Sequence, residues 1–333
     1  MRCLFRFGAG FAAVLTAAAC GAPAPAPPPP APQPVPAAAP TRVTAAFARQ
    51  VGADELGRVP VLMYHRITAQ PRSVYDRTPA DFTAELERLA AEDYVPVTTA
   101  DLVARRLDLP AGAHPVVLTF DDGDPSAFSL TPQGQPAPGT AVRILLDVAA
   151  AHPRFRPVAS LYVNEHPFGE AEDGRALRWL AEHQFEIGNH TRQHTNLRTA
   201  SDSEVTAAIT EEDAAIRRTG YQPTTLALPY GTHPRRAELA LRGPGYSYGG
   251  ALLVGAGPAP SPCSSDFEPG SIPRIRSQSS SGKEAEYGSS HWLDELASPA
   301  GHRYTSDGDP ATVSYPRSGP APAPACASVG LAY

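Results

Sequence analysis

Apolar runs alternate with amphipathic segments along much of the chain, from residue 59 to about residue 230. The runs have the length and composition of buried strands, and they lie at 59–64, 95–98, 116–120, 158–163, 185–188 and 225–229. The segments between them have helical spacing, for example at Phe82, Leu86 and Leu89, and predict helices at 79–92, 141–151, 176–183 and 203–218. Strands that alternate with helices predict βα units, and hence a parallel sheet or a barrel.

The pattern weakens beyond residue 246, where Pro, Ser and Gly become frequent. Stretches rich in these residues run over 255–270 and 277–288, and a short helix is expected at 292–296. Residues 318–333 are rich in Pro and Ala. We therefore expect a single folded domain over 51–317, followed by a Pro/Ala-rich tail over 318–333.

The first residues carry the pattern of an export signal. Arg2 and Arg6 precede an apolar stretch over 7–19, which is too short to cross a membrane as a helix. The residues from Leu15 to Gly21 resemble the lipobox of bacterial lipoproteins, in which Cys20 would carry the lipid. We expect a lipoprotein signal peptide at 1–19; ordinary secretory cleavage with an incidental Cys20 is the alternative.

Residues 20–50 are dominated by Pro and Ala in their first part, a composition that favours extended polyproline II and cannot bury a core. We expect this segment to tether an exported domain at the cell surface. Lipid on Cys20 would hold it at the outer face of the cytoplasmic membrane.

The net charge limits the classes of binding partner, and the cysteines indicate the redox state of the compartment. A net charge of −6 without a stripe of Lys and Arg argues against a nucleic-acid partner. Of the four cysteines, Cys3 leaves with the signal and Cys20 takes lipid, so Cys263 and Cys326 remain. In an oxidising compartment this pair suggests a disulfide; two free thiols are the alternative.

Two pairs of polar residues at predicted strand ends are the candidates for a catalytic site. Asp121 and Asp122 directly follow one predicted strand, and His190 and His194 follow another. Imidazoles at i and i+4 would share one face of a helix, about 5–6 Å apart at Cβ, and could bind one metal ion together with a carboxylate. A second carboxylate could deprotonate a water at an open coordination position. Because the βα loops of a barrel converge at the carboxyl ends of its strands, these groups predict a metal-assisted hydrolase.

Three motifs together resemble the polysaccharide deacetylase family, also called the NodB-homology or carbohydrate esterase 4 group. They are Thr119-Phe120-Asp121-Asp122-Gly123, His190-Thr191-Arg192-Gln193-His194 and Leu228-Pro229-Tyr230-Gly231. The resemblance covers most of residues 59–276 and implies a distorted (β/α)7 barrel with a single catalytic domain. Asp121 would then be the catalytic base, and the Tyr230 N–H would stabilise the oxyanion. The implied ligands of a divalent metal are Asp122, His190 and His194, a set that suits zinc.

The sequence departs from the common family pattern at two positions. Ala227 stands where the third motif usually has an Arg, so Asp121 must be oriented from elsewhere, and Arg274 is our candidate. No Leu-x-His motif near the C-terminus supplies the acid. Instead, Met63-Tyr64-His65-Arg66 resembles the poly-N-acetylglucosamine deacetylase branch, in which an early Tyr-His pair supplies it. His65 is therefore expected to be the acid.

The expected function is removal of N-acetyl groups from an N-acetylhexosamine polymer of the surface or the cell wall, with release of acetate. An O-acetyl glycan esterase would use the same metal site with less need for an acid at His65. A surface glycan-binding lipoprotein with an inactive site is a third possibility, suggested by Ala227 and by the long segment 126–157. The sequence leaves open whether that segment covers the cleft or packs outside it.

Overall fold

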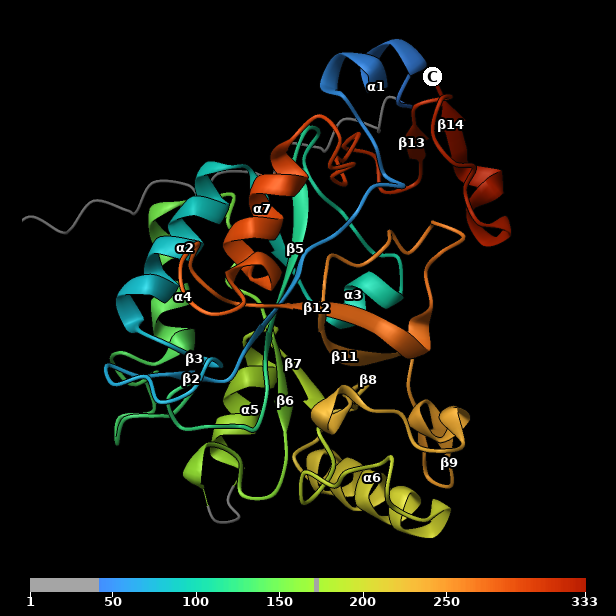
Figure 1. The fold of residues 1–333 in the computed structure, drawn as a ribbon. Coiled ribbons are helices and arrows are strands. Elements are labelled where there is room, and N and C mark those ends of the chain that lie inside the picture. The colour runs from blue at the N-terminus through green and yellow to red at the C-terminus, as the bar shows by residue number, and fades with distance from the viewer. Residues whose placement is uncertain (1–41, 171–173) are drawn as a thin grey trace, which may run out of the picture. The chain divides into compact units, whose positions relative to one another are not determined.

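Residues 42–170 and 174–333 are described by a computed structural model (Figure 1). The expected signal peptide at 1–19, Cys20 and most of the tether lie outside the described residues, so these expectations stay predictions. Within the described ranges, no helix is long and apolar enough to cross a membrane.

Parallel strands form the central sheet, and seven of them close into a barrel. The strands of this sheet are β1 (Val61–Tyr64), β4 (Tyr94–Val97), β5 (His114–Phe120), β6 (Ser160–Val163), β7 (Glu186–Asn189), β8 (Thr225–Ala227), β11 (Gly250–Ala256) and β12 (Ile272–Arg276). Around the barrel the order is β1, β12, β11, β8, β7, β6, β5, and β5 pairs again with β1. This closure confirms the predicted (β/α)7 barrel.

The remaining strand, β4, lies outside the closed ring. The first half of β5 pairs with β4, starting with His114 opposite Tyr94. Its second half pairs with β1, ending with Phe120 opposite Tyr64. All residues of β5 are buried, including the polar His114 and Thr119, and the centre of the strand, Val116 to Leu118, is apolar. The end of β5 therefore delivers the following carboxylates to the carboxyl edge of the barrel.

Helices surround the barrel (Figure 1), and all except α3, which was not predicted, lie close to their expected positions. They are α2 (Pro79–Ala91), α3 (Thr99–Val103), α4 (Ala141–Ala151), α5 (Arg175–Glu182), α6 (Asp202–Arg217) and α7 (Ser289–Ala297). Several begin at a Thr or Ser whose side chain accepts from a backbone N–H of the first turn. At α6, Ser201 and Glu204 form a reciprocal capping box, which starts the helix directly after the loop that carries His194.

Segment 126–157 packs against the hydrophobic core of the domain. It contains α4, and Phe128 belongs to the main hydrophobic core. The Phe128 ring lies 5.5 Å from the ring of Phe168 and 5.1 Å from that of Trp179, measured between centroids. This burial anchors the segment beside α5.

Two barrel strands have no counterpart among the predicted elements. β11 begins with Gly and has a second Gly near its end, and β12 reads Ile-Pro-Arg-Ile-Arg, so neither forms a clean apolar run. The side chain of Arg274 in β12 is nevertheless fully buried, because it finds oxygen partners inside the barrel. Hydropathy alone does not reveal a buried charge that is paired.

The folded region extends beyond both predicted domain boundaries. All but the last residue of α1 (Ala45–Val51) lies within the expected tether at 20–50. The expected tail at 318–333 contains a 3₁₀ helix, η6 (Pro324–Val329), and a strand, β14 (Gly330–Ala332), which pairs with β13 (Val313–Tyr315). Residues 318–333 are therefore part of the fold, because Pro and Ala can dock on a core that other residues form. α1, β13 and β14 lie together at the end of the domain away from α6 (Figure 1).

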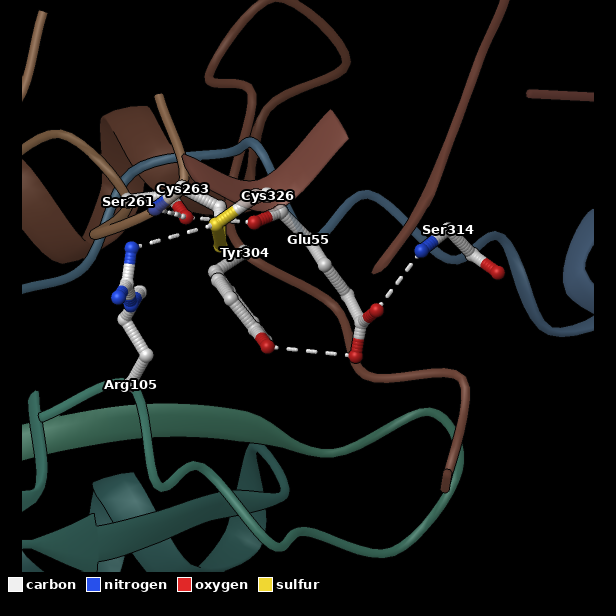
Figure 2. The surroundings of a disulfide bond; sticks show 7 residues. All are labelled: Glu55, Arg105, Ser261, Cys263, Tyr304, Ser314 and Cys326. Carbon is white, nitrogen blue, oxygen red and sulfur yellow. Dashed lines mark hydrogen bonds between the residues drawn. A yellow bond between two sulfur atoms is a disulfide. The ribbon is translucent and has the colours of Figure 1, made fainter. Parts of the chain in front are cut away.

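A disulfide between Cys263 and Cys326, with Cα atoms 5.7 Å apart, fastens the C-terminal segment and confirms the predicted pairing. Figure 2 shows the buried Glu55 beside it, on the segment that precedes β1. The Ser314 N–H donates to the carboxyl group of Glu55 over 2.8 Å and the Tyr304 hydroxyl over 3.2 Å. The disulfide and this carboxyl group thus join segments that are far apart in the sequence.

Candidate metal centre and active site

The structure gathers the predicted site residues at the carboxyl ends of the strands. Asp121 and Asp122 follow β5, and His65 follows β1. His190 follows β7, and Tyr230 follows β8. These strands belong to one barrel, so the side chains meet although their sequence positions are far apart.

The three predicted metal ligands form one cluster. Ligand atoms of Asp122, His190 and His194 all lie within 4.8 Å of one another. Oδ1 of Asp122 is 3.5 Å from Nε2 of His190 and 3.7 Å from Nε2 of His194. Nδ1 of His190 lies 2.8 Å from the carbonyl oxygen of Ala227, so this nitrogen donates to the backbone and Nε2 is left for a cation. One carboxylate and two imidazoles suit a divalent ion that keeps open coordination positions.

The two imidazoles meet across a turn, and the helical geometry expected from their spacing is wrong. Residues 190–194 form a loop between β7 and α6, with a positive φ of 61° at Thr191 and 49° at His194. Thr191 stabilises this turn, because its N–H donates to Oδ1 of Asn189 over 2.7 Å and its hydroxyl accepts from the Thr195 N–H over 3.0 Å. The imidazole centroids end 4.9 Å apart.

Asp121 is held by Arg274, the partner expected to replace the missing motif Arg. The guanidinium donates to both carboxylate oxygens, over 2.7 Å and 2.6 Å, and both side chains are almost completely buried. It also donates to the carbonyl of Leu253 over 2.6 Å and to the Thr119 hydroxyl over 3.1 Å. Burial alone would raise the pKa of Asp121, but the charges of Arg274 and His190 outweigh it and hold that pKa well below its usual range. The carboxylate is thus ionised and fixed in orientation.

His65 also lies close to the Asp121 carboxylate. Its Nε2 is 3.9 Å from Oδ2 of Asp121, the same distance that separates this oxygen from Nε2 of His190. Nδ1 of His65 is buried and has no hydrogen-bond partner among the described residues, so Nε2 is the nitrogen that faces the site. Burial lowers the pKa of His65, against the opposing charges of Asp121 and Asp122.

Tyr230 stands at the rim of the cluster. Its backbone is in the left-handed region with φ 57°, its side chain is 58% exposed, and its ring lies 4.6 Å from that of His194 between centroids. No backbone carbonyl among the described residues accepts from the Tyr230 N–H. The next residue is Gly231, whose positive φ and contact with the Val254 backbone leave no room for a Cβ. Within the described ranges, the Tyr230 N–H therefore has no backbone acceptor, and the residue lies beside His194.

Sequence reasoning missed two features of this site. The backbone carbonyl that orients His190 comes from Ala227, the position singled out only for the Arg that it lacks. Arg192, between the two histidines, forms ion pairs with Glu165 and Glu212. Its position inside the second motif was the available signal, but its partners are distant in sequence.

Comparisons with known proteins bear on the fold and on the family. Residues 108–249 match the family model described as Polysaccharide deacetylase. The Streptococcus pyogenes deacetylase PplD, solved in complex with acetate, is similar in fold, with a TM-score of 0.54 and 19% identity over 71% of this chain and 97% of that one. The polysaccharide deacetylase BC0361 of Bacillus cereus has a TM-score of 0.52 and 20% identity over 66% of this chain and 64% of that one. A search of curated proteins found no match.

Residues 108–249 thus carry a polysaccharide deacetylase domain, the family that the motifs predicted. The fold and the enzyme class that this family implies, a (β/α)7-barrel deacetylase of polysaccharides, are confirmed with it. Enzymes of this family use a divalent metal, and Asp122, His190 and His194 are placed to bind one.

Proposed function

We propose that this protein is a zinc-dependent N-deacetylase that hydrolyses N-acetyl groups of an N-acetylhexosamine polymer at the cell surface. The observation that carries the proposal is the buried Arg274–Asp121 pair beside the cluster of Asp122, His190 and His194. A fixed, ionised carboxylate next to a candidate metal site is what hydrolysis of an amide by activated water requires.

A divalent cation held by Asp122, His190 and His194 would lower the pKa of a water and polarise the acetyl carbonyl. Asp121 accepts the proton of the attacking water at Oδ2, the oxygen that lies 3.9 Å from Nε2 of both His65 and His190. Arg274 keeps this oxygen in place through its bidentate hydrogen bonds.

Two further groups act on the tetrahedral centre. The Tyr230 N–H donates a hydrogen bond to the oxyanion, which is stronger there than to the neutral carbonyl. His65 donates a proton from Nε2 to the departing nitrogen, and its lowered pKa makes the protonated imidazole a stronger acid. The products are acetate and a free amine on the glycan.

The sequence supports the proposed polymer and the proposed location. The Tyr64-His65 pair resembles the poly-N-acetylglucosamine deacetylase branch, which supports an N-acetylglucosamine polymer as substrate. The signal pattern at 1–19 and Cys20 support export and a lipid anchor on the outer face of the membrane.

The test is acetate release from N-acetylglucosamine oligomers and from acetylated xylan, with the metal stripped and then restored. We expect release from the oligomers only, dependence on zinc, and loss in Asp121→Asn with zinc still bound. Release from xylan alone would identify an O-acetyl esterase. Glycan binding without release from any glycan would identify an inactive binding protein, and either result would overturn the proposal.

A further inference from the structure

The two histidines of the metal cluster are not equally supported. His190 is buried, its N–H donates to the Val163 carbonyl over 2.9 Å, and its Nδ1 is paired with Ala227. His194 is partly exposed and lies in the left-handed region. Among the described residues, no hydrogen bond to its ring is found, and its aromatic and ion-pair neighbours are His190, Tyr230 and Asp122. The position of His194 therefore depends on the turn that carries it.

Arg192 connects this turn to two neighbouring elements through its backbone. Its N–H donates to the carbonyl of Ala208 in α6 over 2.9 Å. Its carbonyl accepts from the N–H of Glu165, in the loop after β6, over 2.9 Å. The middle of the turn is thus bonded on both sides.

The side chain of Arg192 bonds to the same two elements as its backbone, α6 and the loop after β6. Its guanidinium donates to Glu212 of α6 over 3.2 Å and to Glu165 over 3.0 Å. The Glu212 side chain is only 1% exposed, so its carboxylate depends on the guanidinium for a partner of opposite charge. The carboxylates of Glu212 and Glu165, on separate elements, therefore hold Arg192, which lies between His190 and His194 in the sequence.

We propose that Arg192 is a positioning residue that fixes His194 as a metal ligand. The proposal rests on the metal site of the proposed function. A guanidinium that only fastened α6 would contribute to stability and leave the metal affinity of the folded protein unchanged. A guanidinium that fixes the turn contributes to the metal affinity itself, because a mobile His194 must be ordered when the ion binds.

The chain contains a matched control on the same helix. Arg217, at the far end of α6, forms an ion pair with Asp213, which is almost as buried as Glu212. Among the described residues, its guanidinium donates to Asp213 and Gln222 and not to the turn, and Asp213 also accepts from the Tyr248 hydroxyl. Arg217→Met therefore removes a comparable ion pair of α6 and leaves the hydrogen bond from Tyr248 to Asp213 in place.

The experiment measures zinc affinity of the full chain by competition with a chromogenic chelator, under conditions where each variant is folded by circular dichroism. Arg192→Met should weaken zinc binding by about 10- to 100-fold, the usual effect of removing a group that orients a ligand. Arg192→Lys, which can reach only one carboxylate, should fall between Arg192→Met and the wild type. Arg217→Met should stay within twofold of the wild type.

The proposal is overturned if Arg192→Met binds zinc like the wild type, or if Arg217→Met weakens binding as much. Should Arg192→Met fail to fold, Arg192→Lys and Arg217→Lys provide the same comparison. Zinc affinity is measured without substrate, so loss of binding in Arg192→Met supports the proposal even if the wild type releases no acetate. Failure of the proposed function and failure of this inference are thereby distinguished.

Discussion

Substitution of Arg274 by Met tests whether the buried ion pair fixes Asp121. Met keeps the length and apolar stem of the side chain but removes the guanidinium and its hydrogen bonds to Asp121, Thr119 and Leu253. Loss of one partner of a buried pair leaves an uncompensated charge, and such losses cost about 3–5 kcal/mol of unfolding free energy. Two hydrogen bonds to a charged group, at about 1.5–3 kcal/mol each, give a similar figure.

The assay is a double-mutant cycle of denaturant unfolding, in the presence of a chelator so that metal makes no contribution. Arg274→Met should lose about 3–5 kcal/mol. Asp121→Asn together with Arg274→Met should regain a large part of this loss, because a neutral Asn needs no buried counter-charge. Arg276→Met is the matched control on the same strand; its partner Glu284 is exposed, so about 1 kcal/mol or less should be lost.

The same variants make a prediction about activity. Without Arg274, burial should raise the pKa of Asp121, so the ionised base should form only at higher pH. The acid limb of the rate profile of Arg274→Met should therefore move to higher pH, whereas both variants that contain Asp121→Asn should be inactive at every pH. If the double variant is no more stable than Arg274→Met, and the acid limb does not move, the reasoning is refuted.

Three further predictions concern stability. Opening the disulfide by Cys263→Ala and Cys326→Ala should cost at most about 4 kcal/mol, the chain-entropy value for a separation of 63 residues, with unchanged zinc affinity; loss of zinc would contradict its structural role. Burial and the charge of Asp307 raise the pKa of Glu55 from 4.5 to about 8, so its contribution is fully present below pH 4.5 and is lost as pH rises through 8. The stability difference between wild type and Glu55→Gln should therefore shrink between pH 5 and pH 9 in thermal unfolding, and a difference independent of pH would refute the shift. A Cβ at Gly188 would collide with the Tyr162 ring, so Gly188→Ala should destabilise by about 1–3 kcal/mol in denaturant, and wild-type stability would show that the ring moves freely.

The elements best predicted from the sequence are those with strong local signals. α2, α4 and α6 lie within one or two residues of their expected bounds, because apolar spacing and capping residues are properties of neighbouring positions. β11 and β12 were not predicted, since Gly, Pro and Arg in a strand make sense only inside a barrel that provides partners. The docking of residues 318–333 was missed for the same reason, because it depends on a distant surface and a disulfide.

At the candidate site, too, the residue types were predicted from local motifs, and their arrangement was not. The motifs placed Asp121, Asp122, His190 and His194 at strand ends, and the barrel brings them together. The two histidines, however, do not share a helix face as expected. They lie on a turn in which Thr191 and His194 have left-handed backbone conformations. Such a turn is stabilised by contacts with other elements, which spacing along the chain does not report.

By itself, the sequence determined the resemblance to polysaccharide deacetylases, the alternation of strands and helices, and the types of side chain gathered at the candidate site. Only the tertiary structure decided how these groups are held: Arg274 reaches Asp121 from another strand, the Ala227 carbonyl orients His190, and Arg192 ties the turn of His194 to α6. The physical reason is that a motif specifies which atoms are offered, whereas orientation and charge pairing come from residues that only closure of the barrel brings within hydrogen-bond distance.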